Sequence, residues 1–126
     1  MKVLITGSSG FLGTELKKIL LKKKYKCFFL TQNNQKKLNH YYCPLQNHKN
    51  LKFILDNIKP DVIVNLAAEV NLKTKTKNMY NINSKPLKIF SDYCLKEKKY
   101  LIQSSSILVH GDHKFYSYKT KFKPMN

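Results

Sequence analysis

The sequence predicts an α/β protein of three layers, in which helices cover both faces of a parallel sheet of about five strands. Short apolar, β-branched segments alternate with segments whose apolar residues recur every three or four positions. This alternation is typical of strand–helix–strand units, whose right-handed crossovers place helices on both sides of a sheet. The 126 residues, 42% of them hydrophobic, suffice for one domain with its own core. We therefore expect a single domain over residues 1–126.

The first strand and helix follow from the N-terminal pattern. Residues 2–6 are apolar and rich in β-branched side chains, which suits a buried parallel strand. Residues 11–24 carry apolar side chains at the spacing of one helical face, with lysines toward the C-terminal end. The residues expected to pack on the sheet are Leu12, Leu16, Ile19 and Leu20.

The later elements are predicted from the same patterns. A helix over residues 50–58 is ended by Pro60, and Ser84 is expected to cap a further helix whose first turn tolerates Pro86. A polar stretch, residues 71–78, precedes this last helix. Further strands are expected at residues 26–31, 40–43, 61–68 and 100–106.

Three glycines lie three residues apart between the first strand and the first helix, in the segment GSSGFLG. In a dinucleotide-binding loop, one glycine allows the tight turn, one lets the pyrophosphate approach the backbone, and one lets the helix pack closely on the strand. Amide groups at the start of the helix then bind the phosphates. The strand before and the helix after favour this interpretation over an ordinary glycine-rich turn. The expected fold is therefore Rossmann-like.

The net charge of +17 raises the question of a nucleic-acid partner. All 24 basic residues are Lys, however, and none is the Arg that proteins use for bidentate contacts to bases. The lysines are also dispersed, so we expect only weak, salt-sensitive binding to polyanions and no specific nucleic acid.

The composition also limits the location and the chemistry of the chain. No segment approaches the roughly 18 apolar residues of a membrane span, and the N-terminus lacks the layout of a signal peptide. The cysteines have neither disulfide nor zinc-ligand spacing, so they are expected to be reduced thiols. They are Cys27, Cys43 and Cys94. We expect a cytoplasmic protein with no membrane contact and no metal site.

The segments TGSSGFLG, PDVIVNLAA and SSSILVHG, in this order, resemble the extended short-chain dehydrogenase/reductase family. The resemblance covers essentially the whole chain. It is strongest to the nucleotide-sugar reductases of dTDP-rhamnose biosynthesis, on the segment KPDVIVNLAAEVN. Nucleotide-sugar epimerases and dehydratases of the same family are nearly as similar. The resemblance implies a nicotinamide dinucleotide as cofactor.

The resemblance also implies the residues of a site. Those expected along the cofactor are Gly7, Gly10, Phe11, Leu12, Gly13, Ala67 and Ala68. Either Asn81 or Asn83 matches a family Asn at the start of a helix, and the spacing does not choose between them. Ser106, with Ser105 as the alternative, matches the residue that hydrogen-bonds the substrate oxygen. Both serines lie at the end of the expected strand 100–106, where ligands of open α/β sheets bind.

NADP(H) is favoured over NAD(H). NAD-preferring relatives often carry an acidic residue after the second strand for the ribose 2′-hydroxyl. Here residues 31–34 are uncharged, and Lys36 and Lys37 follow, which would attract a 2′-phosphate. Pro44 stands where many relatives place an Asp beside the adenine, so this chain departs from that contact.

The catalytic Tyr-x-x-x-Lys pair of the family is missing. Tyr116 and Tyr118 are followed four residues later by Thr120 and Phe122. The pair and the substrate domain are expected beyond Asn126. We therefore expect the NAD(P)-binding portion of a nucleotide-sugar reductase, truncated, split or decayed, that binds a nucleotide sugar only when a C-terminal part completes it.

Two alternatives stay open for the function. One is a fragment of a nucleotide-sugar epimerase or dehydratase. The other is a non-catalytic dinucleotide-binding protein that acts as a sensor or regulatory subunit, since a fold alone does not decide function. A downstream reading frame that encodes YGxxK would identify a split or broken enzyme. The oligomeric state is left open.

Overall fold

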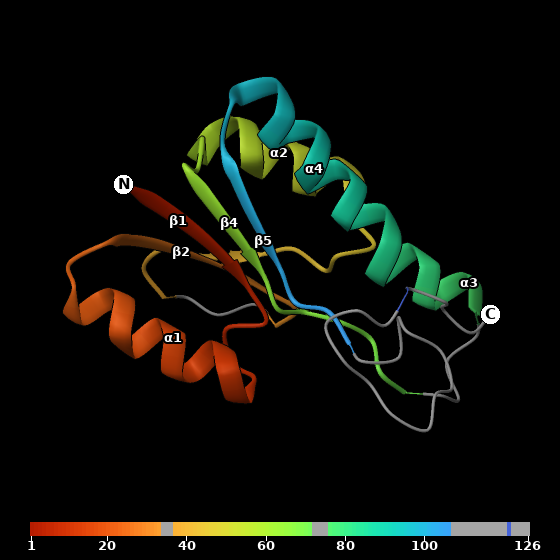
Figure 1. Ribbon diagram of the computed structural model, residues 1–126, viewed down its shortest axis with the longest axis horizontal. Helices are drawn as coiled ribbons and strands as arrows, with labels where there is room; N and C mark the ends of the chain where they lie inside the picture. Colours follow the sequence, from red (N-terminus) through yellow and green to blue (C-terminus); the bar gives the residue numbers. More distant parts are fainter. Residues whose placement is uncertain (34–36, 72–75, 107–120, 122–126) are drawn as a thin grey trace.

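The computed structural model describes residues 1–33, 37–71, 76–106 and 121. They form a five-stranded parallel sheet with helices on both faces, as predicted (Figure 1). In chain order the elements are β1 (Lys2–Thr6), α1 (Phe11–Lys22), β2 (Lys26–Thr31), β3 (His40–Tyr42), α2 (His48–Ile58), β4 (Val62–Asn65), α3 (Thr76–Met79), the π-helix η1 (Tyr80–Ser84), α4 (Lys85–Glu97) and β5 (Tyr100–Gln103).

The strand order is β3-β2-β1-β4-β5, and every neighbouring pair is parallel. The chain moves outward from β1 through β2 to β3, and it returns to the other side of β1 as β4. Val3 of β1 therefore pairs with Cys27 of β2 on one side and with Val62 of β4 on the other. The direction of winding reverses between β1 and β4, which is where open α/β sheets form a crevice at the carboxyl ends of their strands.

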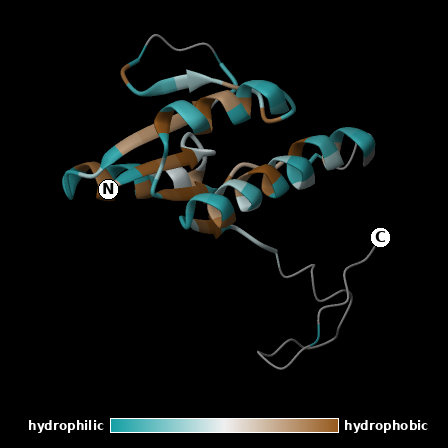
Figure 2. Cartoon of the chain, turned by 90° about the horizontal axis from the view of Figure 1, so that it is seen from above, coloured by the Kyte–Doolittle hydropathy of each residue, from teal (hydrophilic) through white to brown (hydrophobic). Residues whose placement is uncertain are grey.

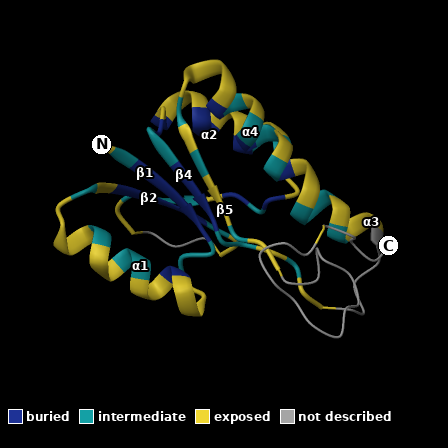
Figure 3. Ribbon diagram, viewed as in Figure 1, coloured by how far each residue is buried: buried dark blue, intermediate teal, exposed yellow. Residues whose placement is uncertain are grey.

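Two apolar cores lie on opposite faces of the sheet, because successive strand residues point to opposite faces. Val3 and Ile5 of β1 belong to the core under α1, whereas Leu4 belongs to the core under α2 and α4. Strands β1, β2 and β4 are largely buried, whereas the edge strand β5 and the outer helix surfaces are mostly exposed (Figure 3). Hydrophobic residues likewise gather between the layers (Figure 2).

Helix α1 packs on the sheet through two of the four residues predicted to do so. Leu16 and Leu20 contact the core, but Leu12 and Ile19 are 62% and 53% exposed. Gly13 is the buried residue of α1. At about 100° per residue, Leu12 and Ile19 lie about 100° and 120° from Gly13 around the helix. The close approach at Gly13 therefore sets the rotation of α1 and leaves both side chains in solvent.

The strands β4 and β5 are shorter than predicted. Strand β4 stops at Asn65, and the amide of Ala67, two residues later, donates to the side-chain oxygen Thr6 Oγ1 at 3.1 Å. Strand β5 stops at Gln103, where Ser104 donates from both its amide and its hydroxyl to the carbonyl oxygen of Asn65, each at 3.1 Å. Side-chain hydroxyls thus end both strands at the same edge.

Helix α2 begins two residues before the predicted start. Asn47 caps it by accepting a hydrogen bond from the amide of Asn50 at 3.1 Å, so residue His48 is already helical. The helix ends at Ile58, as predicted, followed by Lys59 in the left-handed conformation.

The predicted Ser84 cap is wrong, and the polar stretch 71–78 is helical from Thr76. Ser84 has helical dihedral angles and makes no capping hydrogen bond. Helix α3, the π-helix η1 and α4 follow one another without a break. The π-helix lies directly before Pro86, which has no N–H to donate to the carbonyl oxygen of Ile82, four residues earlier. The amide of Lys85 donates to the carbonyl oxygen of Tyr80, five residues back, as in a π-helix.

Candidate functional site

The glycine loop between β1 and α1 needs glycine at two positions for different reasons. Gly7 has φ of +68°, and a Cβ there would lie 2.8 Å from the amide nitrogen of Ala67. Gly13 lies under the loop, where a Cβ would overlap the carbonyl oxygen of Gly7. The loop is therefore held against both the end of β4 and the first turn of α1.

Helix α1 offers free amides at its N-terminus. Its N-cap, Gly10, brings no side-chain hydrogen bond, and its first turn holds no acidic residue. At Gly10 itself the backbone is extended, and a Cβ would meet only the Gly7 oxygen at 3.3 Å. Amides of a first helical turn lack partners within the helix and favour an anion. The start of α1 is thus arranged to accept a phosphate group.

A cavity of about 650 Å³ extends from this loop along the carboxyl ends of β1, β2 and β4. No acidic side chain lines it among the residues that the structure describes. Its volume is within the usual range of ligand pockets. The lining residues are Thr6, Gly7, Ser8, Ser9, Gly10, Thr14, Lys17, Leu30, Thr31, Gln32, Asn33, Lys37, His40, Cys43, Leu45, Leu66, Ala67, Ala68 and Ile82.

Four residues expected along the cofactor line this cavity, and three do not. Those that line it are Gly7, Gly10, Ala67 and Ala68. Phe11 and Leu12 are 88% and 62% exposed and lie outside the lining, so only their backbone can serve the site. Gly13 supports the loop from below.

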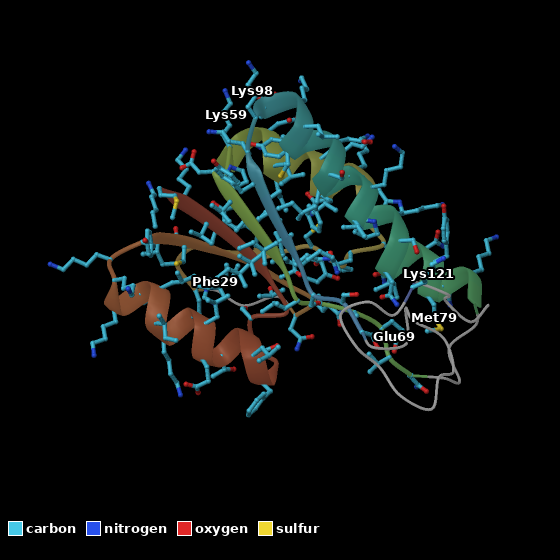
Figure 4. The ribbon with its side chains drawn as sticks, in the orientation of Figure 1. Phe29, Lys59, Glu69, Met79, Lys98 and Lys121 are labelled. Atoms are coloured by element: carbon cyan, nitrogen blue, oxygen red, sulfur yellow. The ribbon has the colours of Figure 1, made fainter. Side chains whose placement is uncertain are left out.

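The structure distinguishes the two candidate asparagines by their contacts. The side chain of Asn83 accepts from the amide of Glu69 at 2.8 Å and donates to its carbonyl oxygen at 3.0 Å. Asn81 instead uses its backbone oxygen, which lies 3.0 Å from His48 Nε2. Neither lines the cavity, although Ile82 between them does. Asn83 therefore positions the loop after β4, which includes Glu69 (Figure 4).

Neither of the two candidate serines after β5 lines the cavity. Ser105 and Ser106 are exposed and are not among its lining residues, whereas Ser104 is tied to Asn65. The tail candidates lie outside the described residues, and so does one of the two lysines expected to attract a phosphate. These residues are Lys36, Tyr116, Tyr118, Thr120 and Phe122.

A buried hydrogen-bond network under the cavity was not predicted. Thr6 donates to Asn65 Oδ1 at 2.5 Å and accepts from the amide of Ala67, and Asn65 donates to Gln103 Oε1 at 2.7 Å. The network joins the carboxyl ends of β1, β4 and β5 and fixes Ala67 against the glycine loop. The sequence signal for this network was a polar residue at the end of each of the three strands, since polar groups need hydrogen-bond partners when they are buried.

Cys43 stands in the cavity wall after β3. Burial raises the pKa of its thiol above the ordinary value, and a hydrogen bond from Asn50 opposes that effect. Cys43 is 1% exposed and, like the other two cysteines, unpaired. It is therefore a neutral, apolar part of the wall. Among the described residues no group of His, Cys, Asp and Glu side chains could hold a metal ion, and no helix is long and apolar enough to cross a membrane.

The fold and this cavity define a Rossmann-like α/β protein whose site lies at the point where the winding of the sheet reverses. The chain belongs to the family described as the RmlD substrate binding domain, whose model matches residues 1–126. The resemblance found in the sequence is thereby confirmed.

Solved structures of nucleotide-sugar enzymes share this fold. A hypothetical dTDP-4-dehydrorhamnose reductase from Sulfolobus tokodaii is 26% identical, with a TM-score of 0.83 over 100% of this chain and 47% of that chain. A UDP-Glc/GlcNAc 4-epimerase from Campylobacter jejuni is 20% identical, with a TM-score of 0.83 over 99% and 44%. A dTDP-glucose 4,6-dehydratase from Bacillus anthracis, in complex with NAD, is 24% identical, with a TM-score of 0.72 over 100% and 45%. The chain spans less than half the length of these proteins.

Proposed function

We propose that residues 1–126 form the dinucleotide-binding part of a nucleotide-sugar reductase similar to dTDP-4-dehydrorhamnose reductase. The match to the Sulfolobus reductase at 26% identity supports the reductase branch. The epimerase and dehydratase matches are below 25% identity and support the fold alone. A fragment of an epimerase or dehydratase, and a non-catalytic sensor or regulatory subunit, are the alternatives. A cytoplasmic location is part of the proposal.

The observation that carries the proposal is the joint position of the glycine loop, the α1 amides and the cavity. Gly7 and Gly10 line a cavity that begins at the uncapped N-terminus of α1 and continues to the end of β2. A dinucleotide needs these features in this order, with a pyrophosphate at the helix and a ribose at the end of the second strand. The small side chains of Ala67 and Ala68 leave the middle of the cavity open for the second ribose.

NADP(H) is the preferred cofactor in this proposal. A carboxylate at the end of β2 would pair with a ribose 2′-hydroxyl and repel a phosphate. The cavity presents Thr31, Gln32 and Asn33 there, with Lys17 and Lys37 as its described lysines. The electrostatic balance at this end therefore favours an additional phosphate.

We expect the 126-residue chain to bind the cofactor without catalysing turnover. No tyrosine in this sequence has a Lys four residues later. Reduction of a sugar ketone needs a proton donor beside the carbonyl oxygen, and a serine hydroxyl of ordinary acidity is a poor one at neutral pH. Incubation with NADPH and a 4-keto sugar nucleotide should give no cofactor oxidation. Steady oxidation that is lost on Tyr116→Phe or Tyr118→Phe would contradict this expectation.

A titration followed by NADPH fluorescence tests cofactor binding. We expect saturable binding to the unmodified chain and none to Gly10→Val. The backbone at Gly10 is extended, as any residue can be, and a Cβ would meet only the Gly7 oxygen at 3.3 Å, so the variant should fold, while its side chain blocks the approach of the pyrophosphate. Gly10→Ala should weaken binding less. Unchanged affinity in a folded Gly10→Val protein, shown by circular dichroism, would remove the glycine loop from the site.

A further inference from the structure

Lys17 lies in the second turn of α1 and lines the cavity. It is about 40° from Gly13 around the helix, so both residues face the sheet. The two lysines that line the cavity within the described residues are Lys17 and Lys37, and they come from different elements. Lys17 belongs to a helix and is half-buried, whereas Lys37 is exposed in the segment before β3.

An aromatic platform holds the ammonium group of Lys17. Its Nζ lies 4.5 Å from the centroid of the Phe29 ring, in the geometry of a cation–π contact. Phe29 is 3% exposed and lies between α1 and the sheet (Figure 4). The ring of His40, paired with Phe29 in the sheet register, stacks at 4.8 Å from it. The position of the ammonium group is therefore fixed by β2 and β3 as well as by α1.

His40 presents a lone pair to this ammonium group. Its Nδ1 lies 2.9 Å from the carbonyl oxygen of Leu38, which can only accept, so Nδ1 carries a proton. Nε2 then faces Lys17 Nζ at 3.5 Å as an acceptor. The imidazole carries no negative charge, so this contact orients Lys17 without cancelling its charge.

No carboxylate in the described part of the chain forms an ion pair with Lys17. The next residue, Lys18, does pair with Glu15, at 2.7 Å, and both of those side chains are exposed. Two successive lysines of one helix therefore differ: Lys18 is neutralised in solvent, and Lys17 keeps its charge beside the cavity. A half-buried, uncompensated cation interacts more strongly with an anion than an exposed one does.

From these contacts, and resting on the proposed dinucleotide binding, we propose that Lys17 is the main residue that selects a ribose phosphate at the end of β2. His40 and Phe29 hold its ammonium group, and Lys37 contributes from the rim. The ligand class is an adenine nucleotide with a phosphate monoester on its ribose. Specificity is thus set by helix α1 and strand β3 as well as by the segment after β2.

Titrations of NADPH and NADH into three proteins test this assignment, at about 0.15 M salt to limit nonspecific attraction to the basic chain. The proteins are the unmodified chain, Lys17→Gln and Lys18→Gln. Both variants remove one positive charge from the same helix, so a general loss of charge affects them equally. We expect Lys17→Gln to lower NADPH affinity about tenfold or more, as for a lost charge-assisted hydrogen bond. NADH affinity should stay within about twofold, and Lys18→Gln should change neither.

The outcomes separate this inference from the function on which it rests. If neither dinucleotide binds the unmodified chain, the proposed function fails and the inference with it. If NADPH binds and Lys17→Gln leaves its affinity unchanged, or lowers NADH affinity equally, the inference alone is overturned. Repeating the comparison with 2′,5′-ADP and 5′-AMP isolates the ribose phosphate, and only 2′,5′-ADP should lose affinity in Lys17→Gln.

Discussion

The hydroxyl of Thr6 donates a hydrogen bond of 2.5 Å to Asn65 Oδ1, and both residues are 1% exposed. The two residues are 59 positions apart and end adjacent strands of the sheet. The same Thr6 oxygen accepts from the amide of Ala67, which lines the cavity. One hydroxyl therefore couples the position of the cavity wall to the pairing of β1 and β4.

Replacing Thr6 with Val should destabilise the protein by about 2–6 kcal/mol. The shape is nearly conserved, but Asn65 Oδ1 loses its donor and the Ala67 amide loses its acceptor in a buried place, each costing about 1–3 kcal/mol. Urea unfolding measures the loss, and Thr6→Ser, which keeps the hydroxyl, should recover most of it. Equal stability of the Val and Ser variants would show that the methyl group contributes as much as the network and would contradict this prediction.

Gly13→Ala should lower the free energy of unfolding by about 1–3 kcal/mol or more. In an unconstrained helix the same change would gain about 1 kcal/mol. Here the new methyl group would overlap the Gly7 carbonyl oxygen, and either the loop or the helix must move. The comparison is Gly10→Ala, whose methyl group would meet only the Gly7 oxygen at 3.3 Å. A stabilised Gly13→Ala protein would contradict the close packing of α1 on the loop.

Asn83→Ala should cost about 1–2 kcal/mol, whereas Asn81→Ala should cost little. The Asn83 side chain makes two hydrogen bonds to the backbone of Glu69, while Asn81 meets His48 through its carbonyl oxygen, which alanine retains. Amide hydrogen exchange at Glu69 provides the direct measurement and should accelerate in the Asn83 variant alone. Equal effects of the two substitutions would remove the distinction between these asparagines.

Asp61 should make the free energy of unfolding depend on pH in the acid range. A hydrogen bond from Lys99, with a second from the Lys2 amide, lowers the pKa of this carboxyl group below its ordinary value of 3.8. Because the pKa is lower in the folded state, the ionised carboxylate stabilises the fold. This contribution to the free energy of unfolding is fully present above pH 3.8 and is lost as the pH falls through the lower, folded-state pKa. Asp61→Asn should therefore be less stable at pH 7, and the difference should shrink in acid.

Asp56→Asn, at an exposed position of α2, is the control for Asp61. It should match the unmodified chain across the same pH series in urea unfolding. A difference between Asp61→Asn and the unmodified chain that stays constant down to strongly acid pH would mean that the carboxylate charge plays no part.

The sequence predicted the features that depend on local patterns. The apolar, β-branched residues of β1 and the spacing of the glycines predicted the buried strand and the loop, because each pattern lies within one short stretch of sequence. The pairing of Thr6 with Asn65 could not be predicted, since it depends on which strands become neighbours. The burial of Leu12 was predicted wrongly, because the packing of Gly13 sets the rotation of α1. The π-helix before Pro86 was also missed. Ser84 was expected to cap a helix, but the residues on both sides of it are helical.

The central claim is that the cavity at the carboxyl ends of β1, β2 and β4 binds a nicotinamide dinucleotide through the glycine loop. The most direct measurement is a titration of the ¹⁵N-labelled chain with NADPH, followed by amide chemical shifts. We predict saturable shifts at Gly7, Gly10 and Ala67, while Lys59 and Lys98, which follow α2 and α4 at the opposite end of the sheet (Figure 4), stay unchanged. Shifts spread over the exposed lysines without saturation, or no shift at the glycine loop, would contradict the account.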